Sequence, residues 1–408
     1  MPALQKKNFL FLQTIASPFF KELGKALMRE GHAVHKINFN GGDFFFWHGL
    51  CETNYTGHPE DFQSFLGEFL TINSISDIIL FGDCRPWHMQ AISSAEQKNI
   101  DIWVFEEGYL RPHWVTLEKG GVNANSPFQL SSDSLNSENA GEPLSPDVEM
   151  SGGFKQRVFY DFVYNGANFA FKWKFPHHKT HRPYPILKEY ASWSRRLFKL
   201  TLDRKRPDKI IASFIQKQGA KYLFPLQLDS DFQLRAHSPF KTMPEAIQFV
   251  LQDFARHSPA ETHLLIKNHP LDNGLINYKR QIETLARDLG VSKRISYIDG
   301  GDLNQILEQV NGVVTINSTV GITALENGLP VMLLGKAIYD IEGLVHSMED
   351  KEFWSTPTTP KSDLAYRFQS ELIEESLVNG NFYTRTGISC AVKNSIARIK
   401  NSANLPLE

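Results

Sequence analysis

The 408-residue chain has few cysteines, little net charge and no long apolar run. Its three cysteines, Cys51, Cys84 and Cys390, form no CxxC pair, which disfavours a zinc ribbon or a disulfide framework. No segment approaches the ~18 consecutive apolar residues of a transmembrane helix. The 43 Lys and Arg nearly balance the 45 Asp and Glu, so we expect no nucleic-acid partner. These absences predict a cytoplasmic protein whose membrane contact is peripheral.

Two nucleotide-binding motifs are also missing. No GxGxxG follows the first predicted strand and no GxxxxGK(S/T) occurs, which disfavours dinucleotide oxidoreductases and P-loop NTPases. Aromatic residues are plentiful instead: Phe, Trp and Tyr make up 12% of the chain.

Short apolar strands alternate with helical segments in both halves of the chain. This alternation is typical of βαβ units and a parallel sheet, so we expect an α/β fold with two Rossmann-like domains facing a cleft. Ligands of such sheets bind at the carboxyl ends of the strands. The strands are predicted at residues 9–13, 33–39, 77–81, 101–105, 222–228, 263–267, 295–298, 312–316 and 330–334.

Composition changes along the chain predict its division into domains. A stretch at 129–150 has five acids and no Lys or Arg, whereas residues 155–209 have 14 Lys and Arg against four acids. We therefore expect four parts: a Rossmann-like domain at 1–150 that ends in the acidic loop, a basic aromatic helical segment at 151–210, a second Rossmann-like domain at 211–380, and a C-terminal helix at 381–408 that packs back on the first domain.

The densest group of charged residues follows the strand at 101–105. Glu106 and Glu107 come directly after it, with Arg111 close behind. Side chains alternate along a strand, so we expect only one carboxylate to face a ligand. A carboxylate there can serve as nucleophile, base or electrostatic partner, whereas the plainer alternative is a solvated turn paired with Arg111. The neighbouring loops supply further polar candidates for sugar binding: Arg85, Asn123, Asn125 and Ser126.

The second half places polar groups after two strands. His269 follows Lys267 at one strand end and can donate to a leaving phosphate or act as a general acid, although a lone histidine is more often structural. Asn317, Ser318 and Thr319 begin a helix and predict an anion site, or else an ordinary N-cap.

Two patterns suggest metal binding only weakly. Asp229 and Asp231 have a DxD spacing but fit a turn equally well, and the histidines at 177–181 lie among Lys and Arg that would repel a cation. We therefore expect neither a metal nor a cofactor.

Taken together and in order, these motifs resemble those of the capsular polysaccharide β-Kdo transferases of Gram-negative bacteria, of the KpsS type. The resemblance spans roughly residues 8–385. It rests on Gly41-Gly-Asp43, Phe81-Gly-Asp-Cys-Arg-Pro-Trp87, Phe105-Glu-Glu-Gly-Tyr-Leu-Arg-Pro112, Gly121-Val-Asn-Ala-Asn-Ser126, Pro225-Leu-Gln-Leu-Asp-Ser230, Lys267-Asn-His-Pro270, Thr315-Ile-Asn-Ser-Thr319 and Phe353-Trp354.

The resemblance implies a GT-B fold and transfer of Kdo from CMP-Kdo, with retention, to phosphatidylglycerol. The first domain would hold the acceptor and the second the CMP-sugar. It also implies action at the inner membrane, beside a KpsC-type transferase and a capsule ABC exporter. Related enzymes carry Glu-Asp-Gly where this chain has Glu-Glu-Gly, so Glu107 falls at the position of the proposed nucleophile.

The same resemblance implies roles for the other candidates. The donor would contact Arg85, Arg111, Gln227, Ser230, Lys267, His269, Asn317, Ser318 and Thr319, and the acceptor Asp43, Asn123, Asn125 and Ser126, with Glu106 beside the nucleophile. The alternatives are a transferase of another CMP-activated nonulosonic acid and a non-catalytic export component.

The basic aromatic segment suits an anionic membrane surface, because it combines rings with cations. The candidate contacts are Lys172, Trp173, Lys174, Arg195 and Arg196. The alternative is an interdomain helix whose aromatic residues are core.

Overall fold

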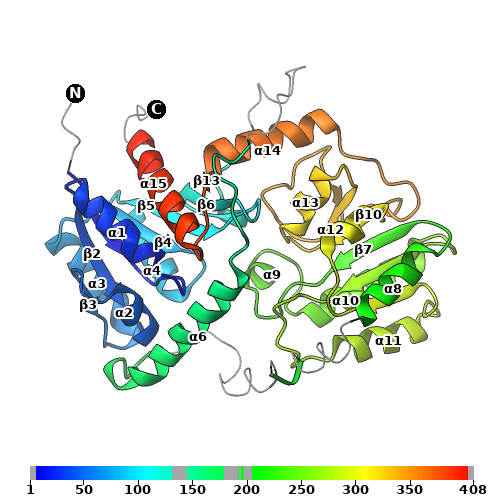
Figure 1. Ribbon diagram of the computed structural model, residues 1–408, viewed down its shortest axis with the longest axis horizontal. Coiled ribbons are helices and arrows are strands. Elements are labelled where there is room, and N and C mark those ends of the chain that lie inside the picture. The colour runs from blue at the N-terminus through cyan, green and yellow to red at the C-terminus, as the bar shows by residue number, and fades with distance from the viewer. Residues whose placement is uncertain (1–5, 131–144, 179–191, 193, 197–204, 403–408) are drawn as a thin grey trace. The chain divides into compact units, whose positions relative to one another are not determined.

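The computed structural model describes residues 6–130, 145–178, 192, 194–196 and 205–402 (Figure 1). They form two compact units, treated separately below. The first contains residues 1–129, 143–181 and 370–408, and the second contains 130–142 and 182–369. The segment expected between two domains, 151–210, is thus shared by both units. Most of the acidic loop, at 131–144, and much of the basic segment, at 179–191, 193 and 197–204, lie outside the described residues.

The first unit contains a seven-stranded sheet with the order β13-β6-β5-β4-β1-β2-β3. Five of its strands run parallel, β6 is antiparallel to β5, and β13 is antiparallel to β6. The strands are β1 (Asn8–Phe11), β2 (Ala33–Asn38), β3 (Thr53–Asn54), β4 (Asp77–Phe81), β5 (Asp101–Glu107), β6 (Trp114–Lys119) and β13 (Leu377–Asn379).

Helices cover both faces of this sheet. Helices α1 (Phe19–Arg29) and α15 (Arg385–Ser402) pack on one face, where they share a core with Trp103 and Phe105 of β5. Helices α3 (Phe62–Ile72) and α4 (Pro86–Glu96) pack on the other face against Ile102 and Val104. The C-terminal helix therefore returns to the first unit, as predicted (Figure 1).

Two helices beyond these layers pack closely against each other. The Gly-Gly-Asp motif opens α2 (Gly41–Trp47), and α6 (Phe154–Ala170) lies against it. A Cβ atom on Gly41 would lie 2.3 Å from the Ala167 carbonyl oxygen, so only glycine permits this approach. Three short 3-10 turns complete the unit: η1 (Pro59–Asp61), η2 (Asn123–Asn125) and η3 (Lys172–Lys174).

The second unit contains a six-stranded parallel sheet with the order β12-β11-β10-β7-β8-β9. Phe353 and Trp354 are fully buried in its core against Tyr222. Its elements are α8 (Arg206–Ile215), β7 (Lys221–Pro225), α9 (Phe232–Ala236), α10 (Met243–His257), β8 (His263–Lys267), α11 (Tyr278–Asp288), β9 (Ile295–Ile298), α12 (Leu303–Leu307), β10 (Gly312–Thr315), α13 (Val320–Glu326), β11 (Val331–Leu333) and β12 (His346–Ser347).

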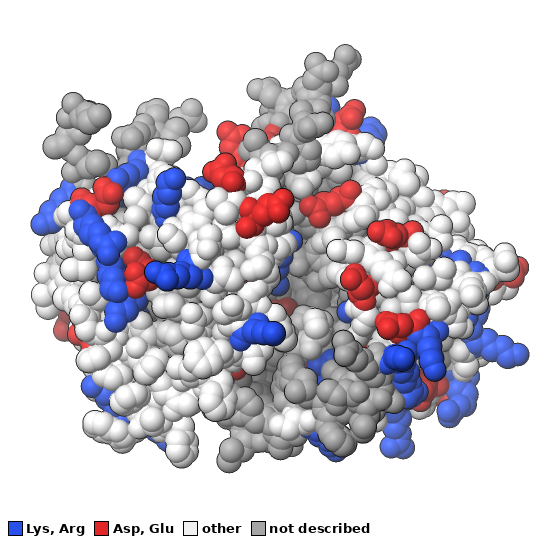
Figure 2. All heavy atoms as spheres, viewed as in Figure 1, with Lys and Arg blue, Asp and Glu red and all other residues white. Residues whose placement is uncertain are grey.

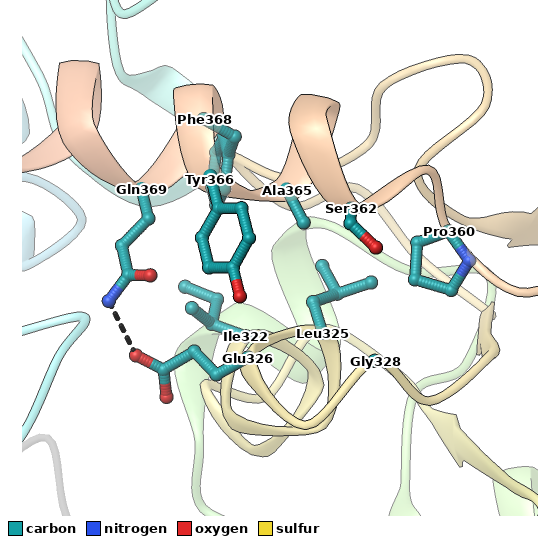
Figure 3. Close-up of a pocket in the computed structure, with 10 residues that line it drawn as sticks. All are labelled: Ile322, Leu325, Glu326, Gly328, Pro360, Ser362, Ala365, Tyr366, Phe368 and Gln369. Atoms are coloured by element: carbon teal, nitrogen blue, oxygen red, sulfur yellow. Dashed lines mark hydrogen bonds between the residues drawn. The ribbon is translucent and has the colours of Figure 1, made fainter. Parts of the chain in front are cut away.

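A small hollow lies between α13 and the start of α14 (Ser362–Ser376), as Figure 3 shows. Ile322 and Leu325 of α13 approach Tyr366 of α14 across it. Gln369 donates a hydrogen bond to Glu326 at 2.9 Å, which ties the two helices together. The α/β class and the two Rossmann-like parallel sheets are as the sequence predicts.

Phe382 is the residue that most directly links the C-terminal segment to the first core. It is 1% exposed, and its ring lies 4.9 Å from that of Phe19 and 5.4 Å from that of Phe81. We expect Phe382→Ala to lower the free energy of unfolding by about 3–5 kcal/mol, because it leaves a cavity. Urea unfolding followed by circular dichroism measures the loss. Phe169, 85% exposed, is the matched control, and an equal effect of Phe169→Ala would contradict the assignment.

Candidate active site

Strand β5 ends in the two carboxylates, and its pleat separates them. Glu106 lies on the face packed by α3 and α4, whereas Glu107 lies on the face packed by α1 and α15. The next residue must be glycine, because a Cβ atom on Gly108 would lie 1.9 Å from the Trp114 carbonyl oxygen. The two acids therefore have different surroundings, as side-chain alternation predicts.

Glu107 is held by two side chains from distant parts of the chain. The Tyr383 hydroxyl donates to its Oε1 at 2.5 Å, and Arg157 Nη1 lies 3.1 Å from the same oxygen. The Arg157 guanidinium also lies over the Tyr383 ring, 5.3 Å from its centre. This arrangement fixes Glu107 as an oriented carboxylate paired with a cation. Sequence reasoning missed Arg157 and Tyr383, and no local motif marks either one.

Glu106 is placed differently. Its Oε1 accepts a hydrogen bond from the Glu107 backbone N–H at 2.9 Å. Burial raises the pKa of Glu106 to about 7, and the Glu107 charge adds to that effect, whereas Arg85 and Arg111 oppose it. A carboxyl group with a pKa near neutrality suits proton transfer at physiological pH.

Both arginines predicted for the donor lie near Glu106. Arg85 Nη1 donates to the Thr14 carbonyl oxygen at 3.2 Å, and its guanidinium lies 5.4 Å from the centre of the Phe81 ring. Arg111 is exposed, and its Nε donates to the Gly108 carbonyl oxygen at 3.1 Å. The carboxyl end of the sheet in this unit therefore gathers two acids and three cations, because Arg157 also lies there.

Asp43 is not placed to bind a sugar. It is fully buried, and its carboxylate accepts hydrogen bonds from the backbone N–H groups of Thr14 and Phe39 and from the Tyr164 hydroxyl, at 3.1, 3.2 and 3.1 Å. These donors belong to the loops after β1 and β2 and to α6. Asp43 therefore holds the loops in place, which corrects its assignment to the acceptor site.

The loop at 121–126 is anchored by buried acids. Asn125 Nδ2 donates to Asp83 at 3.1 Å, and the Ser126 hydroxyl donates to Glu118. Burial raises the pKa of Glu118 to about 7. Asn123 adopts a left-handed backbone with φ of 58°. Asn125 and Ser126 thus have structural partners, and the loop as a whole lies beside the strand ends.

In the second unit, hydrogen bonds join the loop after β7 to the loop after β10. Gln227 Nε2 donates to Asn317 Oδ1 at 2.9 Å, and the Asn317 backbone N–H donates back at 3.1 Å. The Ser318 hydroxyl accepts from Val320 N at 3.2 Å, and Thr319 is the N-cap of α13, so both also form the turn that starts this helix. Ser230, also expected near the donor, is exposed in the loop after β7.

Lys267 ends β8, and His269 lies in the loop that follows it. The His269 Nδ1 accepts from Leu271 N at 3.0 Å, so in the neutral ring the proton lies on Nε2 and makes that atom a donor. Lys267 is 8% exposed, and burial lowers its pKa while Asp299 opposes the shift. A histidine donor and a buried ammonium are suited to an anionic phosphate.

Arg196 is buried in this unit and is not a membrane contact. It is 7% exposed, and its Nη2 donates to Asp299 Oδ1 at 2.5 Å. The guanidinium also donates to the carbonyl oxygens of His269, Pro270 and Asp272. Its planar fork thus holds the whole His269 loop, which corrects the expectation of a surface cation. The preceding residue, Arg195, is exposed.

The carboxylates of the DxD pattern accept hydrogen bonds from the backbone N–H groups at the starts of α10 and α9. Asp229 accepts from Met243 N at 2.9 Å, and Asp231 accepts from Gln233 N at 3.0 Å. Within the described ranges, no three His, Cys, Asp or Glu residues are grouped to hold a metal. In the same ranges, no helix is long and apolar enough to span a bilayer.

Comparison with known proteins places the chain in a family. Residues 76–383 match the family described as capsule polysaccharide biosynthesis protein. The chain belongs to this capsule polysaccharide biosynthesis family. It is 35% identical over 392 residues to the capsule polysaccharide modification protein LipB of Neisseria meningitidis, covering 93% of this chain and 92% of LipB. It is 31% identical over 382 residues to the capsule polysaccharide export protein KpsS of Escherichia coli, covering 93% and 98%.

Solved structures similar to this family member include two transferases. The β-Kdo 2,7 transferase of KpsC from Thermosulfurimonas dismutans is 13% identical, covers 98% of this chain and 100% of its own, and has a TM-score of 0.47. The lipopolysaccharide outer core galactosyltransferase WaaB is 8% identical, covers 97% and 99%, and has a TM-score of 0.38. The predicted resemblance to KpsS-type capsule proteins is confirmed by the family match and by KpsS itself.

The buried fork of Arg196 gives a stability prediction. Arg196→Lys keeps the charge but cannot reach both Asp299 and three carbonyl oxygens, so buried acceptors lose their donors. We expect the free energy of unfolding of the second unit to fall by about 1–3 kcal/mol. The control is Arg195→Lys at the exposed neighbouring position, for which we expect a change within about 0.5 kcal/mol. Equal urea midpoints for the two variants would contradict the stabilising role of the Arg196 hydrogen bonds.

Proposed function

We propose that this capsule protein is a retaining β-Kdo transferase. It moves Kdo from CMP-Kdo to a phosphatidylglycerol-type lipid and so starts the oligo-Kdo linker of a capsular polysaccharide. The observation that carries the proposal is the pair of acids at the end of β5, one paired with a cation and the other with a pKa of about 7. An oriented carboxylate that can attack, beside a second carboxyl group that can take up a proton, is what a two-step transfer with retention requires.

The second unit would hold the CMP-sugar. His269 Nε2–H and the Lys267 ammonium would face the phosphate and stabilise it as it leaves. Gln227 and Asn317, which are hydrogen-bonded to each other, would contact the nucleotide with Ser230, Ser318 and Thr319 nearby.

The first unit would perform the transfer in two steps. A Glu107 oxygen forms a bond to the anomeric carbon while the bond to the CMP phosphate breaks, and CMP leaves. The acceptor hydroxyl then attacks the same carbon and displaces Glu107, and its proton passes to the Glu106 carboxylate. Arg85 or Arg111 would pair with the Kdo carboxylate.

The same proposal includes a place in the cell. A phospholipid acceptor requires the enzyme at the cytoplasmic face of the inner membrane. A KpsC-type transferase would extend the product, and a capsule ABC exporter would remove it.

The test incubates the purified chain with CMP-Kdo and a short-chain, micelle-free phosphatidylglycerol, with mass analysis of the lipid. We expect addition of one Kdo, and none of sialic acid from CMP-sialic acid. Glu107→Gln should lower turnover roughly 1,000-fold or more, because it removes the nucleophile. His269→Ala should lower it about 100-fold, because the phosphate loses a donor.

Glu68→Gln is the matched control, because Glu68 is an exposed glutamate of α3. It should retain full turnover. Absence of CMP release and of lipid product with CMP-Kdo, or full activity of Glu107→Gln, would overturn the proposal.

A further inference from the structure

Helix α6 presents large apolar side chains to solvent. Together with η3 it exposes five aromatic rings and one valine, which we call the α6 face. Their exposed fractions are 55% for Phe154, 49% for Val158, 61% for Phe159, 66% for Phe162, 85% for Phe169 and 78% for Trp173. Soluble proteins rarely leave so many rings exposed together, and such patches usually mark an interaction surface.

The opposite side of α6 is fixed to the first unit by polar contacts. Arg157 binds Glu107, Tyr164 donates to Asp43, and Asn168 accepts from Gly42 N at 2.7 Å. A surface helix normally turns its apolar side toward the core and its polar side toward water. In α6 several polar residues face the protein and large rings face outward. These polar contacts therefore fix α6 to the first unit, and its exposed apolar face is available to bind a partner outside this unit.

The exposed charged residues of α6 and η3 have one sign. Lys155 and Lys172 are exposed, and the Lys174 ammonium lies 4.1 Å from the centre of the Phe44 ring. None of the exposed residues between 154 and 174 is acidic, and the one acid there, Asp161, is half-buried and bonded to Asn165. Figure 2 shows this part of the first unit, at the lower left, as a largely uncharged surface.

We propose that the α6 face binds the surface of an anionic lipid bilayer, with α6 lying in the plane of the interface. Phenylalanine and tryptophan rings enter the boundary between headgroups and acyl chains, and flanking lysines pair with anionic headgroups. A protein partner of this strip would need an acidic rim as well as an apolar groove, whereas a bilayer with anionic lipid supplies both features along its whole surface. The inference goes beyond the proposed transfer, because it concerns binding without a donor.

The test is co-sedimentation of the full chain with vesicles, without CMP-Kdo. We expect binding to vesicles of phosphatidylglycerol and phosphatidylcholine, and much weaker binding to phosphatidylcholine alone. Phe169→Ser with Trp173→Ser should lower the partition coefficient at least about tenfold, because two inserting rings are lost. Lys155→Ala and Lys172→Ala should each lower it about fivefold at low salt and little at high salt.

Ile72→Ser is the matched control, because Ile72 is 79% exposed on α3 of the same unit. It should bind vesicles like the unaltered chain. The proposal fails if the unaltered chain ignores anionic vesicles, or if the Phe169 and Trp173 double variant binds them equally well. It also fails if the double variant still binds vesicles and loses only the ability to associate with other copies of this chain. Transfer to the micelle-free lipid is measured separately, so failure of membrane binding leaves the proposed transferase intact.

Discussion

The site in the first unit depends on the alternation of side chains along β5. Phe105 points to the layer of α1 and α15, and Val104 points to the layer of α3 and α4. Because the strand continues to Glu107, its two carboxylates cannot share a face. One meets Arg157 and Tyr383, and the other is half-buried and accepts a hydrogen bond from the Glu107 backbone. Two chemically identical side chains thus acquire different surroundings from one geometric rule.

The second unit uses the same kind of sheet but fixes its site by other means. Parallel strands bring the loops after β7, β8 and β10 to one edge. Gln227 and Asn317 join two of these loops through paired hydrogen bonds, and Arg196 holds the third through its guanidinium fork. Arg196, which is not among the proposed donor contacts, therefore decides where His269 lies. Such supporting contacts would keep the proposed phosphate site in shape before its ligand arrives.

The sequence predicts the parallel strands well and the supporting contacts poorly. The strands at 77–81, 263–267 and 295–298 have the predicted bounds, because continuous apolar runs mark buried parallel strands. The positions of Glu106, Glu107 and His269 at strand ends follow from the same pattern. Tyr383 lies 276 positions from Glu107, and Arg196 lies 103 from Asp299. Hydrophobic periodicity indicates which face of an element is buried, but not which distant residue contacts it. The sequence therefore predicts Asp43 and Arg196 at surfaces that these side chains do not reach.

The central claim is that Glu106 titrates near neutral pH, so that it can take up the proton of the acceptor hydroxyl, while its neighbour is paired with a cation. Carbon-13 NMR of glutamate-labelled protein, with Glu106→Gln to assign the signal, tests it directly. We expect the carboxyl signal lost in that variant to titrate with a midpoint of about 7 in the unaltered chain. A midpoint near the ordinary glutamate value of about 4.3 would contradict the account.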